Sequence, residues 1–138
     1  MFDLVRTPID LRMLESAVAS DAFGGVVTFV GMVRNRARDG AAVTGLSYEA
    51  FVPLAIEEFR RIADEAGSRF GEVRLAIVHR VGDLAVGDIA VAVAAAAPHR
   101  QAAFEACEFA IGALKSRAPI WKQEHYADGP DVWVANDC

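Results

Sequence analysis

The stretch HRQAAFEACEFAIGALKSRAPIWKQE, residues 99–124, predicts a long helix that is followed at once by a strand. Apolar residues recur at helical spacing in its first part, so we expect a helix from about residue 100 to 116. Pro119 prevents the helix from continuing, and IWKQEHY, residues 120–126, has the composition of a strand. The expected core face of the helix consists of Phe104, Cys107, Ile111 and Leu114.

The same stretch contains the only two lysines of the chain, Lys115 and Lys122, whereas the other twelve basic residues are arginines. Lysine differs from arginine because its amine can lose a proton and act as a base or nucleophile. Two lysines placed seven residues apart indicate either a site for amine chemistry or two positions without a special role. Counting alone does not separate these interpretations.

Lys115 follows Leu114 at the border of the expected core face. Partial burial of its side chain would lower the pKa and favour a reactive amine, although a surface lysine that suits the dipole of a helix C-terminus is the simpler interpretation. The turn before Pro119 brings Lys122 back toward Lys115, and two neighbouring ammonium groups depress each other's pKa and attract anions. Glu124 shares the strand face of Lys122, and it either orients the lysine or forms a weak surface ion pair.

The rest of the chain alternates short strands with two further helices. Asp10 is placed to cap the first helix, and Pro53 suits the first turn of the second. The run GVVTFVGMV, residues 25–33, predicts a central strand that is buried on both faces, and residues 81–83 predict a turn. The second helix should bury Leu54, Ile56, Phe59, Ile62 and Ala63. We expect strands at 2–6, 25–33, 43–50, 72–80, 88–96, 120–126 and 131–135 and helices at 10–19, 53–70 and 100–116, which is an α+β fold with a largely antiparallel or mixed sheet and a C-terminal β-hairpin.

Composition limits the class of protein. At 138 residues the chain fits one domain, residues 1–138, and its 54% hydrophobic and 24% charged residues are typical of a globular protein. A net charge of −5 argues against nucleic acid as the main partner, although a local group of cations can still bind a small anion. No apolar run is long enough to span a bilayer, and residues 1–11 lack the pattern of a secretion signal. Because Cys107 and Cys138 form no CxxC pair and the three histidines are scattered, we expect no disulfide framework, no metal site and a cytoplasmic location.

His99 and Arg100 begin the long helix, where backbone N–H groups and the helix dipole favour a phosphate group. At 1.5 Å per residue, Arg100 lies roughly 22 Å from Lys115 along the helix. One small substrate cannot touch both ends of this helix. Either there are two separate sites, or a dimer brings His99 and Arg100 of one chain to the lysines of the other, and we take the dimer as the working hypothesis.

Other polar residues carry weaker indications. Arg34 follows the strand at 25–33, a common position for a binding residue because the strand fixes where its loop begins. Arg36 and Arg38 in the same loop are expected to be solvated. His79 precedes a tight turn and is expected to be structural, and His125 has no partner that the sequence identifies.

Four segments together resemble the large, catalytic subunit of molybdopterin synthase. They are VTFVGMVRN (27–35), IVHRVGDLAVGD (77–88), PHRQAAFEA (98–106) and LKSRAPIWKQE (114–124), in the order and spacing of that family. The resemblance covers about residues 26–134, and the pattern LKxRAPxWKxE is specific to the family. It implies an α/β-hammerhead-like fold and a central homodimer, with a ubiquitin-like small subunit docked at each end to give a heterotetramer.

The resemblance also implies the reaction. The small subunit would insert its C-terminal Gly-Gly thiocarboxylate into a pocket, and two sulfurs would pass to cyclic pyranopterin monophosphate to form the dithiolene of molybdopterin. No cofactor is expected, because the small subunit supplies the sulfur. Lys115 and Lys122 are implied to be catalytic, with Lys115 either stabilising an oxyanion or attacking the acyl carbon. The implied substrate-binding residues are Phe29, Met32, Val33, Arg34, Gln123 and Glu124, with His99 and Arg100 supplied by the other subunit.

Two other interpretations of the function stay open. A dimeric scaffold that binds a ubiquitin-like partner or a phosphorylated metabolite without turnover would need Arg34 and an apolar docking surface, but no lysine with a shifted pKa. A ferredoxin-like metabolite sensor would suit the α+β pattern but would leave the two lysines unexplained. Cys107 faces the expected core and is not expected to carry sulfur.

Overall fold

The computed structural model describes residues 1–136, which form two sheets and three helices. The helix-covered sheet has the strand order β1-β4-β6-β2, and the hairpin sheet has the order β5-β3-β7-β8. Only β1 and β4 pair in parallel among the described strands, so the α+β fold with a mixed sheet is confirmed. The strands are β1 (Phe2–Val5), β2 (Gly25–Met32), β3 (Val43–Ala50), β4 (Arg74–Arg80), β5 (Gly82–Ala85), β6 (Ile89–Ala97), β7 (Ile120–Tyr126) and β8 (Val132–Ala135), and the helices are α1 (Leu11–Val18), α2 (Val52–Phe70) and α3 (Arg100–Arg117).

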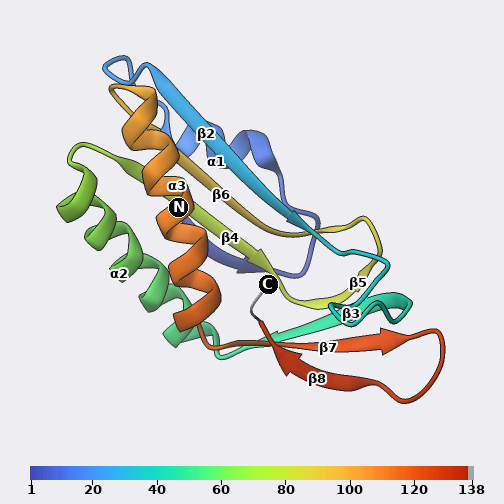
Figure 1. Ribbon diagram of the computed structural model, residues 1–138. Coiled ribbons are helices and arrows are strands. Elements are labelled where there is room, and N and C mark those ends of the chain that lie inside the picture. Colours follow the sequence, from blue (N-terminus) through green and yellow to red (C-terminus); the bar gives the residue numbers. More distant parts are fainter. Residues whose placement is uncertain (137–138) are drawn as a thin grey trace.

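The arrangement is layered (Figure 1). Helices α2 and α3 lie side by side over one face of the helix-covered sheet, and α1 covers the other face. The hairpin sheet extends beyond the C-terminal end of α3, and the β7–β8 hairpin closes it. The predicted C-terminal hairpin is therefore confirmed.

Local sequence rules place most helix ends correctly. Asp10 is the N-cap of α1, and its carboxylate accepts a hydrogen bond from the backbone N–H of Arg12 at 3.0 Å. Pro53 lies in the first turn of α2, and Gly71, with φ at +84°, follows its last residue. Helix α3 ends at Arg117, two residues before Pro119.

Strand β6 is the centre of the core. Eight of its nine residues are buried, because helices cover both faces of the sheet at this point. Alternate residues point to opposite faces of a strand, so Val91, Val93 and Ala95 meet α2 and α3. On the other face, three alanines let α1 pack close to the sheet: Ala92, Ala94 and Ala96.

The prediction of a central strand at residues 25–33 is wrong. Strand β2 is an edge strand that pairs only with β6 within the described sheets, and Met32 is 57% exposed. An apolar, β-branched run fits a strand covered on both faces, but it equally fits an edge strand whose outer residues are left apolar. The strand with two covered faces is β6.

Two other expectations need correction. Residues 82–85 form the short strand β5 rather than a turn, because they pair with β3 from the next layer. The core faces of two helices also differ from the expected ones, since Phe104 is 60% and Leu54 is 56% exposed. Helix α3 buries Cys107 and Leu114 as expected, and it also buries four alanines that let it lie close to β6 and β2: Ala103, Ala106, Ala110 and Ala113.

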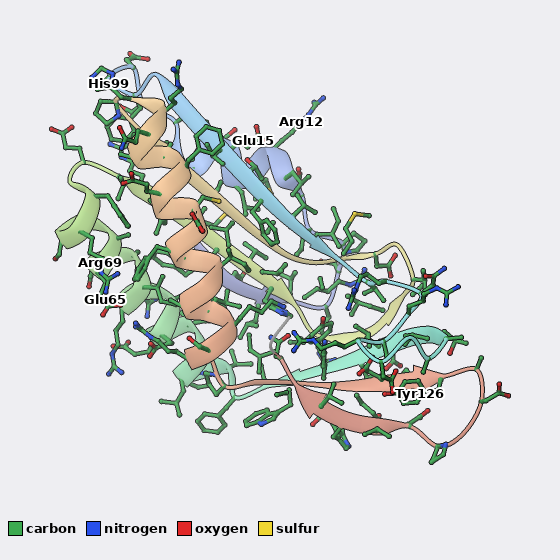
Figure 2. The ribbon with its side chains drawn as sticks, viewed as in Figure 1. Arg12, Glu15, Glu65, Arg69, His99 and Tyr126 are labelled. Atoms are coloured by element: carbon green, nitrogen blue, oxygen red, sulfur yellow. The ribbon has the colours of Figure 1, made fainter. Side chains whose placement is uncertain are left out.

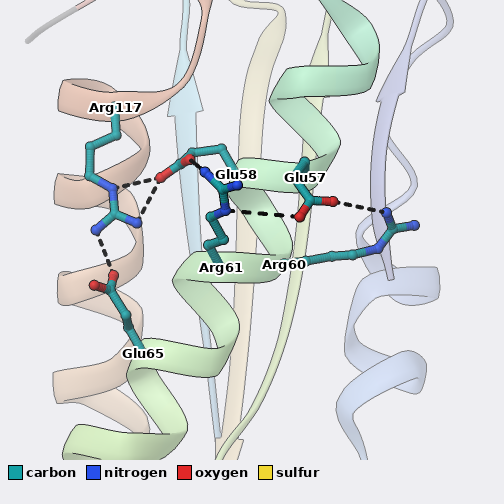
Figure 3. Close-up of polar contacts among 6 residues, drawn as sticks. All are labelled: Glu57, Glu58, Arg60, Arg61, Glu65 and Arg117. Atoms are coloured by element: carbon teal, nitrogen blue, oxygen red, sulfur yellow. Dashed lines mark hydrogen bonds and ion pairs between the residues drawn. The ribbon is translucent and has the colours of Figure 1, made fainter.

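Arg117 fastens the end of α3 to α2 (Figure 3). Its guanidinium contacts the Glu58 carboxylate through Nε and NH2, both at 2.7 Å, and the Glu65 carboxylate through NH1 at 2.5 Å. The hydrogen bond to Glu65 raises the pKa of Arg117 most, and the hydrogen bond to Glu58 raises it further, so the side chain stays charged. Arg61 makes looser contacts with Glu57 and Glu58, at 3.9 and 3.6 Å.

We therefore expect Arg117→Met to lower the free energy of unfolding by about 1 kcal/mol, because two forked contacts between helices are lost at once. Arg61→Met is the matched control, since it removes an exposed arginine whose contacts lie within α2, and its effect should be close to zero. Urea denaturation of both variants measures the difference. Equal losses in the two variants would show that Arg117 does not fasten the helices.

Candidate functional site

A pocket lies where the two sheets meet the C-terminal end of α3. Its walls come from β2 and the loop after it, from β3, β6 and β7, and from the last turn of α3. Elements that are far apart in the sequence therefore converge on one hollow of about 170 Å³. The lining residues are Phe29, Gly31, Met32, Arg34, Arg36, Val43, Leu46, Tyr48, Ala90, Val91, Lys115, Lys122 and Glu124.

Helix α3 delivers Lys115 to this pocket. Leu114 is buried in the core, so the next residue emerges at the border between core and pocket, as the helical spacing predicted. The ammonium of Lys115 donates a hydrogen bond to the side-chain carbonyl of Asn136 at 3.1 Å. Asn136 is itself only 6% exposed, so this contact is partly buried.

Strand β7 delivers Lys122 and Glu124. Because they are two residues apart on a strand, both side chains lie on the pocket face of β7. Across the sheet, Lys122 lies opposite Tyr48 and Glu124 opposite Leu46 of β3. The predicted shared face of Lys122 and Glu124 is therefore present. The turn at Ala118 and Pro119 brings this face back to the end of α3.

The pocket is cationic although the chain as a whole is acidic. Arg34, Arg36, Lys115 and Lys122 face a single carboxylate, that of Glu124, in a chain of net charge −5. Arg36 is exposed, as the sequence predicted, but it also lines the pocket, and its backbone bridges to Ala42. Such a concentration of positive charge suits an anionic substrate.

The remaining predicted site residues lie elsewhere. Val33 is buried in the core beneath the pocket, and its backbone pairs with Gly87 and Asp88. Gln123 lies on the face of β7 opposite to Lys122 and Glu124, level with Ser47.

His99 and Arg100 lie at the far end of α3. They border a separate shallow hollow with Gly24, Pro98 and Gln101, and Figure 2 shows His99 well away from the hairpin sheet that carries Tyr126. Within one chain, α3 thus separates these two residues from Lys115, as the helical rise predicted. His99 is the N-cap residue of α3, but its imidazole makes no capping hydrogen bond.

Tyr48, His79 and Asn136 belong to the surroundings of the site, and sequence reasoning missed their part in it. Tyr48 lines the pocket, and its ring meets the edge of the buried imidazole of His79, with ring centroids 4.8 Å apart. Burial first, and then the nearby charge of Lys115, lower the pKa of His79 to about 4, against a hydrogen bond to the Arg80 carbonyl that raises it. No sequence pattern marks these residues, because Tyr48 and His79 meet only where β3 and β4 come together in the fold, and Asn136 meets Lys115 only at the end of β8.

Two other groups lie outside the pocket. The sequence identified no partner for His125, and the structure supplies two, because its Nδ1 lies 2.8 Å from the Asp131 carboxylate and its Nε2 lies 2.7 Å from the Ser47 hydroxyl. The thiol of Cys107 is buried and donates to the Val93 carbonyl at 3.6 Å. Burial raises the pKa of this thiol, which opposes formation of the reactive thiolate. Cys138 lies outside the described residues.

Residues 1–136 contain neither a metal-binding group of side chains nor a membrane-spanning helix. No three His, Cys, Asp or Glu side chains are grouped so that they could hold a metal ion. None of the three helices is long and apolar enough to cross a membrane.

Comparison with known proteins gives a consistent result. Residues 4–117 match the family model described as MoaE protein. The chain is 44% identical over 135 residues to the molybdopterin synthase catalytic subunit of Nostoc sp., covering 97% of this chain and 81% of that one. It is 40% identical to the protein of the same name from Pyrococcus abyssi, covering 97% and 90% of the two chains.

Solved structures agree. Molybdopterin synthase from Staphylococcus aureus matches with a TM-score of 0.91 at 37% identity, covering 96% of both chains. A complex of subunits 1 and 2 of the molybdopterin-converting factor from Helicobacter pylori matches with a TM-score of 0.72 at 26% identity, covering 91% of this chain and 89% of that one.

The buried, neutral His79 predicts a pH-dependent stability. Its pKa is 6.5 in an unfolded chain and about 4 in the fold, so between these pH values only the unfolded chain binds this proton. Stability is thus unaffected above about pH 6.5 and falls as the pH is lowered toward 4. Between pH 7 and pH 4.5 the wild type should lose about 2 kcal/mol more unfolding free energy than His79→Gln does. Urea denaturation at both pH values tests this, and identical losses in the two proteins would contradict it.

Proposed function

Because the chain belongs to the MoaE family of molybdopterin synthase catalytic subunits, enzymes of molybdenum cofactor biosynthesis, we propose that its pocket transfers sulfur from a protein thiocarboxylate to cyclic pyranopterin monophosphate. The observation that carries the proposal is the convergence of Lys115, Lys122 and Arg34 on one pocket. A thiocarboxylate and a phosphorylated pterin are both anions, and such a pocket offsets their mutual repulsion while holding them together.

Lys115 acts on the acyl group. Its ammonium already donates to an amide carbonyl, that of Asn136, which is the kind of oxygen that the acyl end of the donor presents. After the thiocarboxylate sulfur has bonded to the pterin, water adds to the acyl carbon, and Lys115 offsets the charge of the oxyanion that forms. Collapse of this intermediate breaks the carbon–sulfur bond, which leaves the sulfur on the pterin and a carboxylate on the donor. In the second form of the proposal, a neutral Lys115 adds to the acyl carbon in place of water, the sulfur leaves on the pterin, and the acyl group stays on Lys115.

The other lining residues bind the pterin. Arg34 and Arg36, in the loop after β2, suit the phosphate group of the pterin, since guanidinium groups bind phosphate oxygens in a forked geometry. Phe29 and Met32 supply an apolar wall for the ring, and Glu124 orients Lys122. Val33 and Gln123 have side chains that point away from the pocket, so we assign them a supporting role through the backbone of β7 and of the β2 loop.

The sulfur donor is a ubiquitin-like small subunit with a C-terminal thiocarboxylate. The Helicobacter pylori relative is a complex of subunits 1 and 2, which supports a small-subunit partner for this chain. A homodimer of this chain with one small subunit at each end would form a heterotetramer. Since the partner supplies the sulfur, no resident metal or organic cofactor is required, and we place the reaction in the cytoplasm.

A single-turnover assay separates the two forms of the proposal. Wild-type protein, thiocarboxylated partner and cyclic pyranopterin monophosphate should yield dithiolene product, and Lys115→Ala should lower the rate at least about 100-fold. Lys115→Arg keeps the charge but not the amine chemistry, so residual activity above that of the alanine variant favours the oxyanion form. Equal inactivity of both variants, together with an acyl adduct on Lys115 in wild type, favours the attacking amine.

The outcomes also test the proposal as a whole. Unchanged turnover in Lys115→Ala would remove Lys115 from the reaction. No product from wild type, with the partner shown to bind, would favour the non-catalytic scaffold.

Mixed dimers test whether His99 and Arg100 complete the partner chain's site. The double variant His99→Ala/Arg100→Ala and the variant Lys115→Ala should each be nearly inactive alone. After unfolding and refolding an equal mixture, half of the dimers contain one chain of each kind, and one of their two sites is intact. Activity should then recover to about one quarter of the wild-type value. No recovery from a mixture shown to contain mixed dimers would place both sets of residues in one chain's site.

A further inference from the structure

His79 is a buried polar side chain that the mechanism above leaves unused. It is fully buried in β4, and its Nδ1 lies 2.7 Å from the Arg80 carbonyl. A carbonyl oxygen only accepts hydrogen bonds, so Nδ1 carries the proton and Nε2 keeps a lone pair. Among residues 1–136 this Nε2 is buried and has no hydrogen-bond partner. Buried acceptors are nearly always paired with a donor. The unpaired Nε2 of His79 therefore suggests that a donor binds it in another state of the site, such as the one with substrate bound.

The imidazole of His79 lies directly behind the pocket wall. Its neighbour across the sheet is Val91 of β6, which lines the pocket, and paired residues on neighbouring strands share a face. The ring of Tyr48, which also lines the pocket, meets the imidazole edge at an interplanar angle of 70°. Nε2 is the ring nitrogen farther from the backbone, so the unused lone pair is on the outer end of the ring.

Lys115 is the nearby donor. It lines the same pocket as Tyr48 and Val91, the two residues that lie against His79, and its positive charge adds to burial in lowering the pKa of His79. Its ammonium carries three protons and donates to the Asn136 amide, so displacement of that amide makes a proton available to another acceptor. The charged groups that face it are mostly cationic, since Arg34 and Arg36 come from the β2 loop, Lys122 from β7, and Glu124 supplies the one carboxylate of the lining. An acceptor behind Lys115 would help to keep it charged in these surroundings.

We propose that His79 is a positioning residue for Lys115, whose ammonium donates to the Nε2 lone pair once an acyl donor displaces the Asn136 amide. Held from behind, Lys115 keeps its remaining protons for the acyl oxygen of the donor and stays charged between its cationic neighbours. Neutral His79 suits this role, because a protonated imidazole would repel the ammonium. The identity of the acyl donor rests on the proposed function, whereas the coupling between His79 and Lys115 does not.

The chain is well suited to a direct measurement, because Lys115 and Lys122 are its only lysines. Lysine labelled with ¹³C at Cε gives two signals in an NMR titration, and Lys122→Arg assigns them. Asn136→Ala provides the displaced state in the full chain. On this background, His79→Asn keeps a donor for the Arg80 carbonyl but removes the Nε2 acceptor, whereas His79→Gln places an amide near the position of Nε2. His125→Gln is the matched control, because His125 contacts Asp131 and Ser47 outside the pocket.

The titration midpoint of Lys115 should fall by about half a pH unit or more in His79→Asn, since an acceptor stabilises the charged form of the amine. It should stay near the wild-type value in His79→Gln and His125→Gln, and the midpoint of Lys122 should move less than that of Lys115. An unchanged Lys115 midpoint in His79→Asn overturns the proposal. Equal shifts in His79→Asn and His79→Gln, or equal shifts of both lysines, also overturn it, because they indicate general repacking.

A second measurement needs no change at His79. Coupling between two titrating groups is reciprocal, so Lys115→Met should raise the pKa of His79 above its value of about 4, as followed by ¹⁵N NMR of the three histidines. An unchanged pKa would contradict the coupling even if His79→Asn fails to fold. Neither NMR experiment involves sulfur transfer, so failure of the proposed function would appear as absent product in the turnover assay and not as an absent shift.

Discussion

The close contact between α3 and the helix-covered sheet is the constraint on which the rest of the structure depends. Alanines on the buried face of α3 let the helix lie against β6 and β2, where a larger residue such as Phe104 is turned outward. This contact fixes the axis of α3, and therefore the point in space where its last turn ends. The pocket forms at that point because Pro119 stops the helix and the chain turns straight into β7.

The last turn of α3 also directs its two cationic side chains to different places. Lys115 and Arg117 are two residues apart, so they leave the helix on different sides. Arg117 is held on the α2 side by Glu58 and Glu65, whereas Lys115 enters the pocket and meets Asn136. The acidic residues of α2 thus neutralise the arginine and leave the lysine as the cation that the helix contributes to the site.

The length of α3 has a consequence for assembly. His99 and Arg100 begin the helix and Lys115 lies near its end, so a rigid helix holds two predicted parts of one site apart within a chain. The two ends of the helix therefore belong either to separate sites or, as we propose above, to one site that a second copy completes. The edge strand β2, with its exposed apolar residues, shows that the helix-covered sheet is open on one side in the single chain.

The sequence by itself determined the local features. The ends of α1 and α2 followed from Asp10 and Pro53, and the nearness of Lys115, Lys122 and Glu124 followed from helical spacing, Pro119 and strand alternation. These features depend on interactions between residues that are close in the chain. The specific motif around the two lysines also identified the family, which the comparisons confirm.

Only the tertiary structure decided which elements lie next to one another. It made β2 an edge strand, formed β5 by pairing it with β3, and brought Arg36 into the pocket. It also placed His79 behind Tyr48 and brought Ser47 to His125. Each of these depends on contacts between residues far apart in the sequence, and neither hydrophobic pattern nor propensity carries information about which distant strand or loop will supply the neighbour.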